Sequence, residues 1–308
     1  LSKYGVAIVP EVLNQQECEQ MVSGQWDFFE QITKKWQQPI TRDNEESWNE
    51  IYKLHPSHSM LWQRFNVDHA QVSWDLRQNP KIVEVFKEFW ECDKKEDLLV
   101  SFDGFAFGIP PEKTISYNRF FRQTWMHADQ SYQRSDLECV QSWITGLDVG
   151  VGDATLCFYE GSNNFSREFA ERFPNATQKK DDWYRVKAKE ESKFYEDRCA
   201  KKFIKCPKGS LVLWDSRTIH CGSQAFKHRV DPKFRSVVYL SYLPRNRVEN
   251  QAELIKKQNV FNNMRTTSHW ANQNKLFPIK PGYGKVLPET CAIEKPVLSE
   301  LGRKLAGF

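Results

Sequence analysis

Two histidines and one aspartate offer a set of side chains that can bind a metal ion. His127 and Asp129 stand one residue apart at the end of an expected strand, and His220 closes a second apolar strand that begins at Gly209. Two imidazoles and one carboxylate form the facial triad that holds iron(II) on one side and leaves positions open for other ligands. The His-x-Asp pair alone is weak, because one such pair is expected by chance in this composition. The second histidine makes the combination informative.

Arg235 follows these residues at the start of the alternating run Arg-Ser-Val-Val-Tyr-Leu-Ser-Tyr, which is typical of a strand. Its guanidinium offers a planar fork that can bind the far carboxylate of a dicarboxylic acid. Arg229 is a rival for this role, but it lies in a turn that contains Pro232. The strand position favours Arg235.

The elements that must position these residues change in kind near residue 98. Before it, residues 5–10 indicate a short buried strand, Asn14 and Glu17 have the spacing of a capping box, and Asn79-Pro80 is typical of a helix start. After it, β-branched and aromatic runs predict strands at 98–107, 115–127, 138–147, 154–159, 202–206, 210–214 and 234–243. Many short strands without intervening helices indicate a jelly roll and argue against a parallel sheet. The expected fold class is therefore mainly β with flanking helices around a double-stranded β-helix, the cupin-like core.

We expect three segments within one structural domain. Residues 1–97 supply an N-terminal strand and helices packed on the core, 98–245 form the catalytic double-stranded β-helix, and 246–308 form a C-terminal helix and loops that cover it. Residues 164–173 predict a short helix. The stretch 176–202 is dense in Lys, Asp and Glu, which is typical of a solvated insertion.

Composition excludes several broad classes of protein. The 308 residues carry a net charge of only +4, which gives no support to a nucleic-acid partner. Hydrophobic residues make up 40% of the chain, which excludes a mainly disordered protein, and no apolar run approaches the roughly 18 residues that span a bilayer. The 8 cysteines have irregular spacings without a Cys-x-x-Cys pair, which favours free thiols in a reducing, cytoplasmic location. The chain starts at Leu1, so a removed leader stays open, as does the oligomeric state.

Several motifs in a fixed order resemble the phytanoyl-CoA dioxygenase-like (PhyH) family of iron(II)- and 2-oxoglutarate-dependent oxygenases. The resemblance covers roughly residues 1–245. Its motifs are Gly5-Val-Ala-Ile-Val-Pro, His127-Ala-Asp-Gln, Trp143-Ile-Thr-Gly-Leu-Asp, Asp153-Ala-Thr-Leu-Cys-Phe-Tyr-Glu-Gly, Gly209-Ser-Leu-Val-Leu-Trp and the segment from His220 to Arg235.

The resemblance implies a role for each matching residue. His127, Asp129 and His220 would bind iron(II), Arg235 would bind the C5 carboxylate of 2-oxoglutarate, and Trp143 would line the cosubstrate pocket. The implied reaction uses O2 to hydroxylate an unactivated C–H bond of a small-molecule substrate and releases succinate and CO2. Halogenating relatives replace the carboxylate with a small residue, so Asp129 favours hydroxylation over halogenation.

Three further residues near the triad are candidates for substrate contact, namely Gln130, Tyr132 and Arg122. The other histidines, among them His269, are interpreted as structural, and Asp215 and Arg217 as a structural pair. Two other classes remain open: a non-catalytic metal-binding relative of the fold, and a zinc hydrolase that uses the same triad. The sequence specifies no substrate, and desaturation, cyclisation and epoxidation would use the same residues as hydroxylation.

Overall fold

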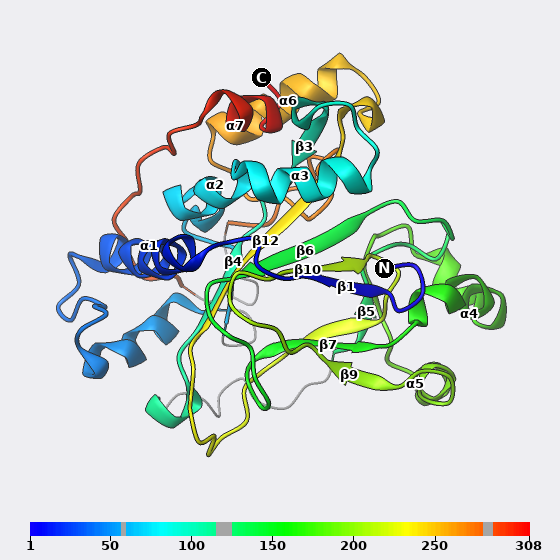
Figure 1. Ribbon diagram of the computed structural model, residues 1–308, viewed down its shortest axis with the longest axis horizontal. Helices are drawn as coiled ribbons and strands as arrows, with labels where there is room; N and C mark the ends of the chain where they lie inside the picture. Colours follow the sequence, from blue (N-terminus) through cyan, green and yellow to red (C-terminus); the bar gives the residue numbers. More distant parts are fainter. Residues whose placement is uncertain (57–59, 115–124, 280–285) are drawn as a thin grey trace.

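Two antiparallel sheets form the centre of the protein (Figure 1). A computed structural model describes residues 1–56, 60–114, 125–279 and 286–308 of the chain. The strands of the larger sheet are β1 (Val6–Val9), β2 (Leu61–Trp62), β3 (Leu98–Val100), β4 (Phe105–Gly108), β6 (Val140–Thr145), β10 (Leu211–Asp215) and β12 (Arg235–Pro244). The strands of the smaller sheet are β5 (His127–Ala128), β7 (Thr155–Tyr159), β8 (Tyr184–Arg185), β9 (Lys201–Phe203) and β11 (His220–Ser223). The 7-stranded sheet runs β1-β10-β6-β12-β4-β2, with β3 also paired to β12, and the 5-stranded sheet runs β8-β5-β11-β7-β9.

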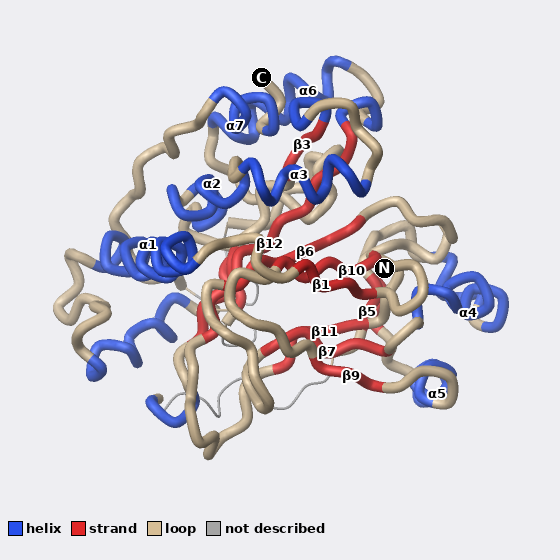
Figure 2. The backbone as a smooth tube through the Cα atoms, in the orientation of Figure 1, coloured by secondary structure: helices blue, strands red, loops and turns tan. Residues whose placement is uncertain are grey.

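Helices cover the outer side of the larger sheet and lie beside one end of the smaller sheet (Figure 2). Those on the side of the larger sheet are α1 (Gln15–Thr33), α2 (Gln71–Arg77), α3 (Pro80–Phe89), α6 (Gln251–Asn262) and α7 (Glu300–Leu305). Those beside the smaller sheet are α4 (Ser166–Arg172) and α5 (Lys189–Glu196). Short 3-10 stretches connect them: η1 (Glu45–Leu54), η2 (Val67–His69), η3 (Lys95–Asp97), η4 (Pro111–Lys113), η6 (Ser162–Phe165), η7 (Pro174–Gln178) and η8 (Arg245–Arg247). This arrangement confirms the expected jelly roll with flanking helices. Among the described residues, no helix combines the length and the apolar character needed to cross a bilayer.

Local sequence signals set the starts of two of these helices. The Asn14 side chain accepts a hydrogen bond of 2.9 Å from the Glu17 N–H, and the Glu17 carboxylate accepts one of 2.7 Å from the Asn14 N–H. Asn79 accepts a bond of 3.0 Å from the Lys81 N–H, with Pro80 as the first helical residue. Both predicted helix starts are confirmed, and each cap stabilises its helix by about 1 kcal/mol.

Alternation along the central strands divides the core into layers. On β6, Trp143 faces the space between the sheets, where it packs with Val212 and Val237. Its neighbour Ile144 faces the other way and joins the larger core under the helices, together with Phe29. Because successive side chains of a strand point to opposite faces, one strand supplies both layers. Burying each such side chain contributes about 1.5–3 kcal/mol.

The expected strand at 98–107 is wrong as a single element. It is divided into β3 and β4, which pair with opposite ends of β12: Val100 lies opposite Tyr242, and Gly108 lies opposite Arg235. At the break, a Cβ on Gly104 would lie 1.7 Å from the main-chain oxygen of Trp62. The chain can pass β2 at this point only with glycine, and the interruption turns residue 103 toward the inside of the molecule.

The charged stretch 176–202 is not simply a solvated insertion, which corrects the sequence interpretation. It contains β8, which pairs with the strand that carries His127, and the amphipathic helix α5. Tyr184, Phe194 and Tyr195 are buried in a cluster behind the smaller sheet, while the charged residues between them face solvent. The aromatic residues decide the structure here, because burial of their rings outweighs the polar average of the segment. For the predicted strand 115–127, residues 115–124 lie outside the described part of the chain.

Candidate metal centre

Two neighbouring strands of the smaller sheet bring the predicted metal ligands together. His127 on β5 lies directly opposite His220 on β11, and Asp129 directly follows β5. One ligand atom from each of the three side chains lies within 4.8 Å of the other two, and all three residues are buried. Strand β11 was not predicted, because His-Cys-Gly-Ser lacks apolar alternation, yet it places the second histidine.

Both imidazoles are held in the tautomer that a metal requires. The Nδ1 atom of His127 lies 2.9 Å from the carbonyl oxygen of Trp125, and that of His220 lies 2.8 Å from the carbonyl oxygen of Thr218. Because a carbonyl oxygen only accepts, each Nδ1 carries the proton, and in the neutral ring each Nε2 keeps a free lone pair. The Nε2 atoms lie 3.5 Å and 3.3 Å from the two carboxylate oxygens of Asp129. Three donor atoms therefore converge on one point.

Asp129 is kept ionised within this cluster. Although burial opposes its charge, the neighbouring His127, His269 and His220 side chains hold the pKa of Asp129 well below its usual range. Burial alone would lower the pKa of His220, and its hydrogen bond to Asp129 raises it instead. The negative charge of Asp129 stabilises a positive charge at the point where the three side chains meet. A bound divalent cation would supply that charge, and it would replace the proton that an imidazole otherwise takes up.

Gln141 and the backbone fix the orientation of the Asp129 carboxylate. The Gln141 side chain, on β6 of the opposite sheet, donates a hydrogen bond of 2.9 Å to Asp129 Oδ2. The Asp129 N–H donates one of 2.9 Å to the main-chain oxygen of Ser216. Such supporting contacts are typical of metal sites, where they hold the ligands in place.

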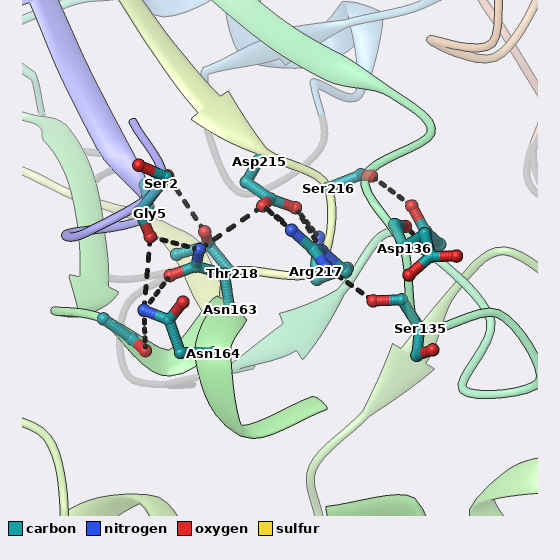
Figure 3. A network of polar contacts seen from close by, with 12 residues as sticks. Ser2, Gly5, Ser135, Asp136, Asn163, Asn164, Asp215, Ser216, Arg217 and Thr218 are labelled. Carbon is teal, nitrogen blue, oxygen red and sulfur yellow. Dashed lines mark hydrogen bonds and ion pairs between the residues drawn. The ribbon is translucent and has the colours of Figure 1, made fainter. Parts of the chain in front are cut away.

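The turn between β10 and β11 is tied down by a polar network (Figure 3). Asp215 accepts hydrogen bonds from the Arg217 N–H at 2.9 Å and from its guanidinium at 2.6 Å, so the predicted pairing of these residues is confirmed. Thr218 donates a bond of 2.9 Å to the main-chain oxygen of Gly5. A Cβ on Gly5 would lie 2.5 Å from the Thr218 hydroxyl, so only glycine fits where the N-terminus supports this turn. The network holds the chain that leads directly into His220.

A cavity of about 400 Å³ opens between the two sheets at these residues. His127, Asp129 and His220 line it together with Arg235 at the start of β12. Its other lining residues come from both sheets and from the segments 60–63, 103, 182–183 and 268–277. The cavity has the size of an ordinary small-molecule site.

Arg235 is buried in this cavity without an acidic partner. Its Nη1 donates a bond of 2.6 Å to the main-chain oxygen of Ala154, its buried Nε makes no hydrogen bond, and the guanidinium lies 5.6 Å from the centre of the Trp143 ring. No carboxylate of the described residues comes within 4.0 Å of it. A buried guanidinium is costly unless an anion pairs with it, so the cavity is suited to a carboxylate ligand.

Arg229, the rival candidate, is already neutralised. Its Nε and Nη2 bind the two oxygens of Glu112 at 3.1 Å and 2.9 Å, and its Nη1 binds Asp153. Although burial alone would raise the pKa of Glu112, the Arg229 guanidinium lowers it to about 2. Of the two arginines, only Arg235 faces the cavity that contains the triad.

Replacing Arg229 should therefore affect stability more than ligand binding. Arg229→Met leaves Glu112 and Asp153 without their cation, and because the pair is only partly buried the cost should lie between that of a surface pair and that of a buried one, about 2 kcal/mol. The free energy of unfolding, measured by urea titration, should fall by about that amount. A loss below about 0.5 kcal/mol, the range of ordinary surface substitutions, would contradict this role.

Other predicted site residues are placed outside the lining of the cavity. Trp143 is fully buried behind Arg235. Gln130 turns its amide onto the main-chain oxygens of residues 134 and 136, at 3.0 Å and 2.8 Å, and accepts a bond from Ser216. The Tyr132 hydroxyl lies 2.8 Å from that of Tyr195 in the cluster behind the smaller sheet. Arg122 lies outside the described residues.

Some cavity residues were missed or misjudged from sequence. His269, interpreted as structural, lines the cavity with its Nε2 3.2 Å from the main-chain oxygen of Asp129. Asp103 and Trp183 also line it, and neither was singled out. The pair Trp183-Tyr184 stands out in the charged run; Tyr184 is buried, whereas Trp183 lines the cavity and stays 43% exposed. Asp103 and His269 had no such signal, because only the tertiary fold brings residues this distant in sequence together.

Comparison with known proteins gives one family and several similar proteins. The family model described as phytanoyl-CoA dioxygenase (PhyH) matches residues 1–226. A protein named Ava biosynthesis cluster protein O, from Aspergillus versicolor, is 29% identical over 202 residues, which are 63% of this chain and 61% of that relative. The match thus spans about three fifths of the curated relative's length.

Two solved structures share the fold. A candidate oxidoreductase from Salmonella typhimurium LT2 superposes with a TM-score of 0.57 at 10% identity, over 100% of this chain and 81% of that chain. The GlcNAc Inducible Gene 2 protein of Candida albicans has a TM-score of 0.52 at 14% identity, over 85% of this chain and 66% of that chain.

Proposed function

The chain belongs to the phytanoyl-CoA dioxygenase family of iron(II)- and 2-oxoglutarate-dependent oxygenases, and from this premise we propose that it hydroxylates an unactivated C–H bond of a small molecule. In this reaction 2-oxoglutarate and O2 are consumed, one oxygen atom enters the substrate, and succinate and CO2 are released. His127, Asp129 and His220 would hold the iron, and Arg235 would bind the distal carboxylate of 2-oxoglutarate.

One observation carries the proposal: a buried arginine without an acidic partner shares a cavity with the three converging donor atoms. The donor set of two imidazoles and one carboxylate suits iron(II) with open coordination positions. A hydrolase that used a metal-activated water would give Arg235 no anion to bind. An oxygenase that takes a dicarboxylate cosubstrate uses both features.

The side chains of this protein would contribute binding, orientation and exclusion of water. The two Nδ1–H donors would keep both Nε2 atoms directed at the metal, and the hydrogen bond from Gln141 would keep the Asp129 carboxylate from rotating. Arg235 would fix the cosubstrate at its far end, while Ala154 holds one of the guanidinium nitrogens in place. Trp125, Trp183 and Trp214 form apolar walls that limit water around the reacting atoms.

When bound, iron(II) together with 2-oxoglutarate and O2 supplies the oxidising chemistry that breaks the C–H bond. The protein's own groups do not need to transfer a proton for this, and the cavity presents a substrate to that chemistry at a fixed distance and angle.

A change at Gln141 tests whether the orientation of the Asp129 carboxylate matters, while all three metal ligands stay in place. Gln141→Leu keeps the side-chain volume and removes the hydrogen bond to Asp129, so the affinity for iron(II) should fall by about 10-fold or more. Equilibrium dialysis against iron(II) without oxygen measures this. A matched change at the next residue of the same strand, Ser142→Ala, removes a bond to the Leu240 main-chain oxygen on β12 and should leave iron affinity unchanged. Equal losses in both variants would contradict a specific role for Gln141.

Isotope labelling tests the reaction itself. The purified chain, loaded with iron(II) and 2-oxoglutarate, is screened against a metabolite panel for succinate release above the background rate. With ¹⁸O2, one labelled atom should enter succinate and one should enter the product. An unlabelled product without succinate release, which takes up label when the reaction is repeated in H2¹⁸O, would indicate a hydrolase, and an unlabelled product with labelled succinate would indicate desaturation or cyclisation.

A further inference from the structure

Asp103 brings an unpaired carboxylate into the cavity, at the break between β3 and β4. Its Oδ1 accepts hydrogen bonds from the Gly104 N–H at 2.7 Å and from the Gln63 side chain at 3.3 Å. Its Oδ2 makes no hydrogen bond to a described residue, and no cationic nitrogen of the described residues lies within 4.0 Å of either oxygen. Arg77 is close, but it donates to the main-chain oxygen of Asp103 and not to the carboxylate.

Burial raises the pKa of Asp103, even though Arg77 and His269 act in the opposite direction. The fold therefore leaves this carboxylate without enough positive charge around it. Asp103 is partly exposed and lines the cavity, so a positively charged group of a ligand can reach its carboxylate.

The other carboxylates that line the cavity, Asp129 and Asp182, have basic partners among the described residues. Asp182 binds the Arg134 guanidinium and accepts a bond of 3.0 Å from the Ser131 N–H. Lys275 lies 3.3 Å from Asp181. At the metal end, under the proposed function, the charges of iron(II) and Arg235 balance those of Asp129 and the two carboxylates of 2-oxoglutarate. Among the three carboxylates that line the cavity, Asp103 is thus the one without a basic partner among the described residues.

Aromatic rings form much of the remaining wall. Five aromatic side chains line the cavity, namely Trp125, Trp183, Trp214, Tyr239 and Phe277. The faces of such rings attract cations and accept flat apolar groups. An unpaired carboxylate among aromatic rings favours a positively charged nitrogen on an apolar frame and disfavours an acid.

We propose that the substrate of this site is an aromatic or otherwise apolar amine whose protonated nitrogen pairs with Asp103. The inference rests on the proposed function, because it names the substrate class of the same cavity. Asp103 would set the specificity by fixing one end of the substrate, while the metal end acts on a C–H bond elsewhere in the molecule.

Calorimetric titration of the whole chain tests this pairing with three matched probes. Tryptamine is cationic, N-acetyltryptamine is neutral and indole-3-propionate is anionic, and all three share one ring system. The protein, held without oxygen with iron(II) and 2-oxoglutarate, should bind tryptamine at least about 10-fold more tightly than either analogue, as expected for a charge-assisted hydrogen bond. In Asp103→Asn this preference should fall below about 2-fold.

Asp182→Asn is the matched control, because it removes a carboxylate that lines the same cavity but is already paired with Arg134. It should keep the preference for tryptamine. The inference is overturned if the three probes bind equally, if tryptamine fails to bind at millimolar concentration, or if Asp182→Asn loses the preference as fully as Asp103→Asn.

The visible band of the iron(II)–2-oxoglutarate complex, recorded on the same samples, separates this inference from the proposed function. A band without a preference for the amine contradicts the substrate class alone. A preference that depends on Asp103, without a band, supports the amine site and contradicts the oxygenase.

Discussion

In His220→Ala the affinity for iron(II) should fall by more than about a hundredfold, and no succinate should be released above background. Mutation of residues that only hydrogen-bond to a metal ligand already lowers metal affinity about 10–100-fold, so loss of a ligand itself should cost more. His220 contributes one of the three converging donor atoms, and the Thr218 carbonyl holds its ring in the required tautomer. Removing the imidazole leaves only two ligands, which hold iron(II) poorly. Equilibrium dialysis without oxygen and a coupled succinate assay measure the two effects.

The control is His228→Ala, which makes the same chemical change at an exposed histidine of the loop before β12. This variant should bind iron(II) and release succinate like the natural chain. Retention of iron affinity in His220→Ala would contradict the assignment of the metal ligands.

Arg235→Met should weaken 2-oxoglutarate binding by about a hundredfold, which corresponds to roughly 3 kcal/mol for a truncated buried charge pair. The affinity for iron(II) should be unchanged, because Arg235 contacts none of the three donor residues in the described structure. Titration of 2-oxoglutarate into the iron-loaded protein measures the first effect.

A cosubstrate without the distal carboxylate makes this test specific. 2-Oxopentanoate should bind the natural chain about as weakly as 2-oxoglutarate binds Arg235→Met, and the variant should no longer distinguish the two acids. Arg229→Met is the matched control and should keep the discrimination despite its lower stability. If Arg229→Met loses it and Arg235→Met does not, the two arginines have been assigned the wrong way round.

The metal-ligand set could be predicted because each residue sits on a recognisable local pattern. His127 and Asp129 share a short motif, and an apolar strand with a glycine turn leads into His220. Family membership, inferred from the order of these motifs, is confirmed by the match over residues 1–226. The choice between Arg235 and Arg229 had only a weak basis in sequence, since it depends on Glu112 and Asp153, which lie far from Arg229 along the chain.

The errors in the sequence interpretation share one physical cause. A continuous strand was predicted at 98–107 because its residues are mostly apolar. The sequence gives no sign that the backbone of Gly104 passes close to β2. The stretch 176–202 was predicted to be solvated because its charged residues outnumber its aromatic residues, yet β8 and α5 bury those aromatic residues. Asp103 and His269 carry no local signal at all. In each case long-range packing, which composition does not record, determines the structure.

The most direct test of the central claim is to add iron(II) and then 2-oxoglutarate to the metal-free protein under strict exclusion of oxygen. Bidentate binding of 2-oxoglutarate to iron(II) produces a metal-to-ligand charge-transfer band in the visible region. We predict that this band appears in the natural chain, is absent in His127→Ala and requires much more 2-oxoglutarate in Arg235→Met. No band in the natural chain, together with tight retention of zinc, would contradict the account.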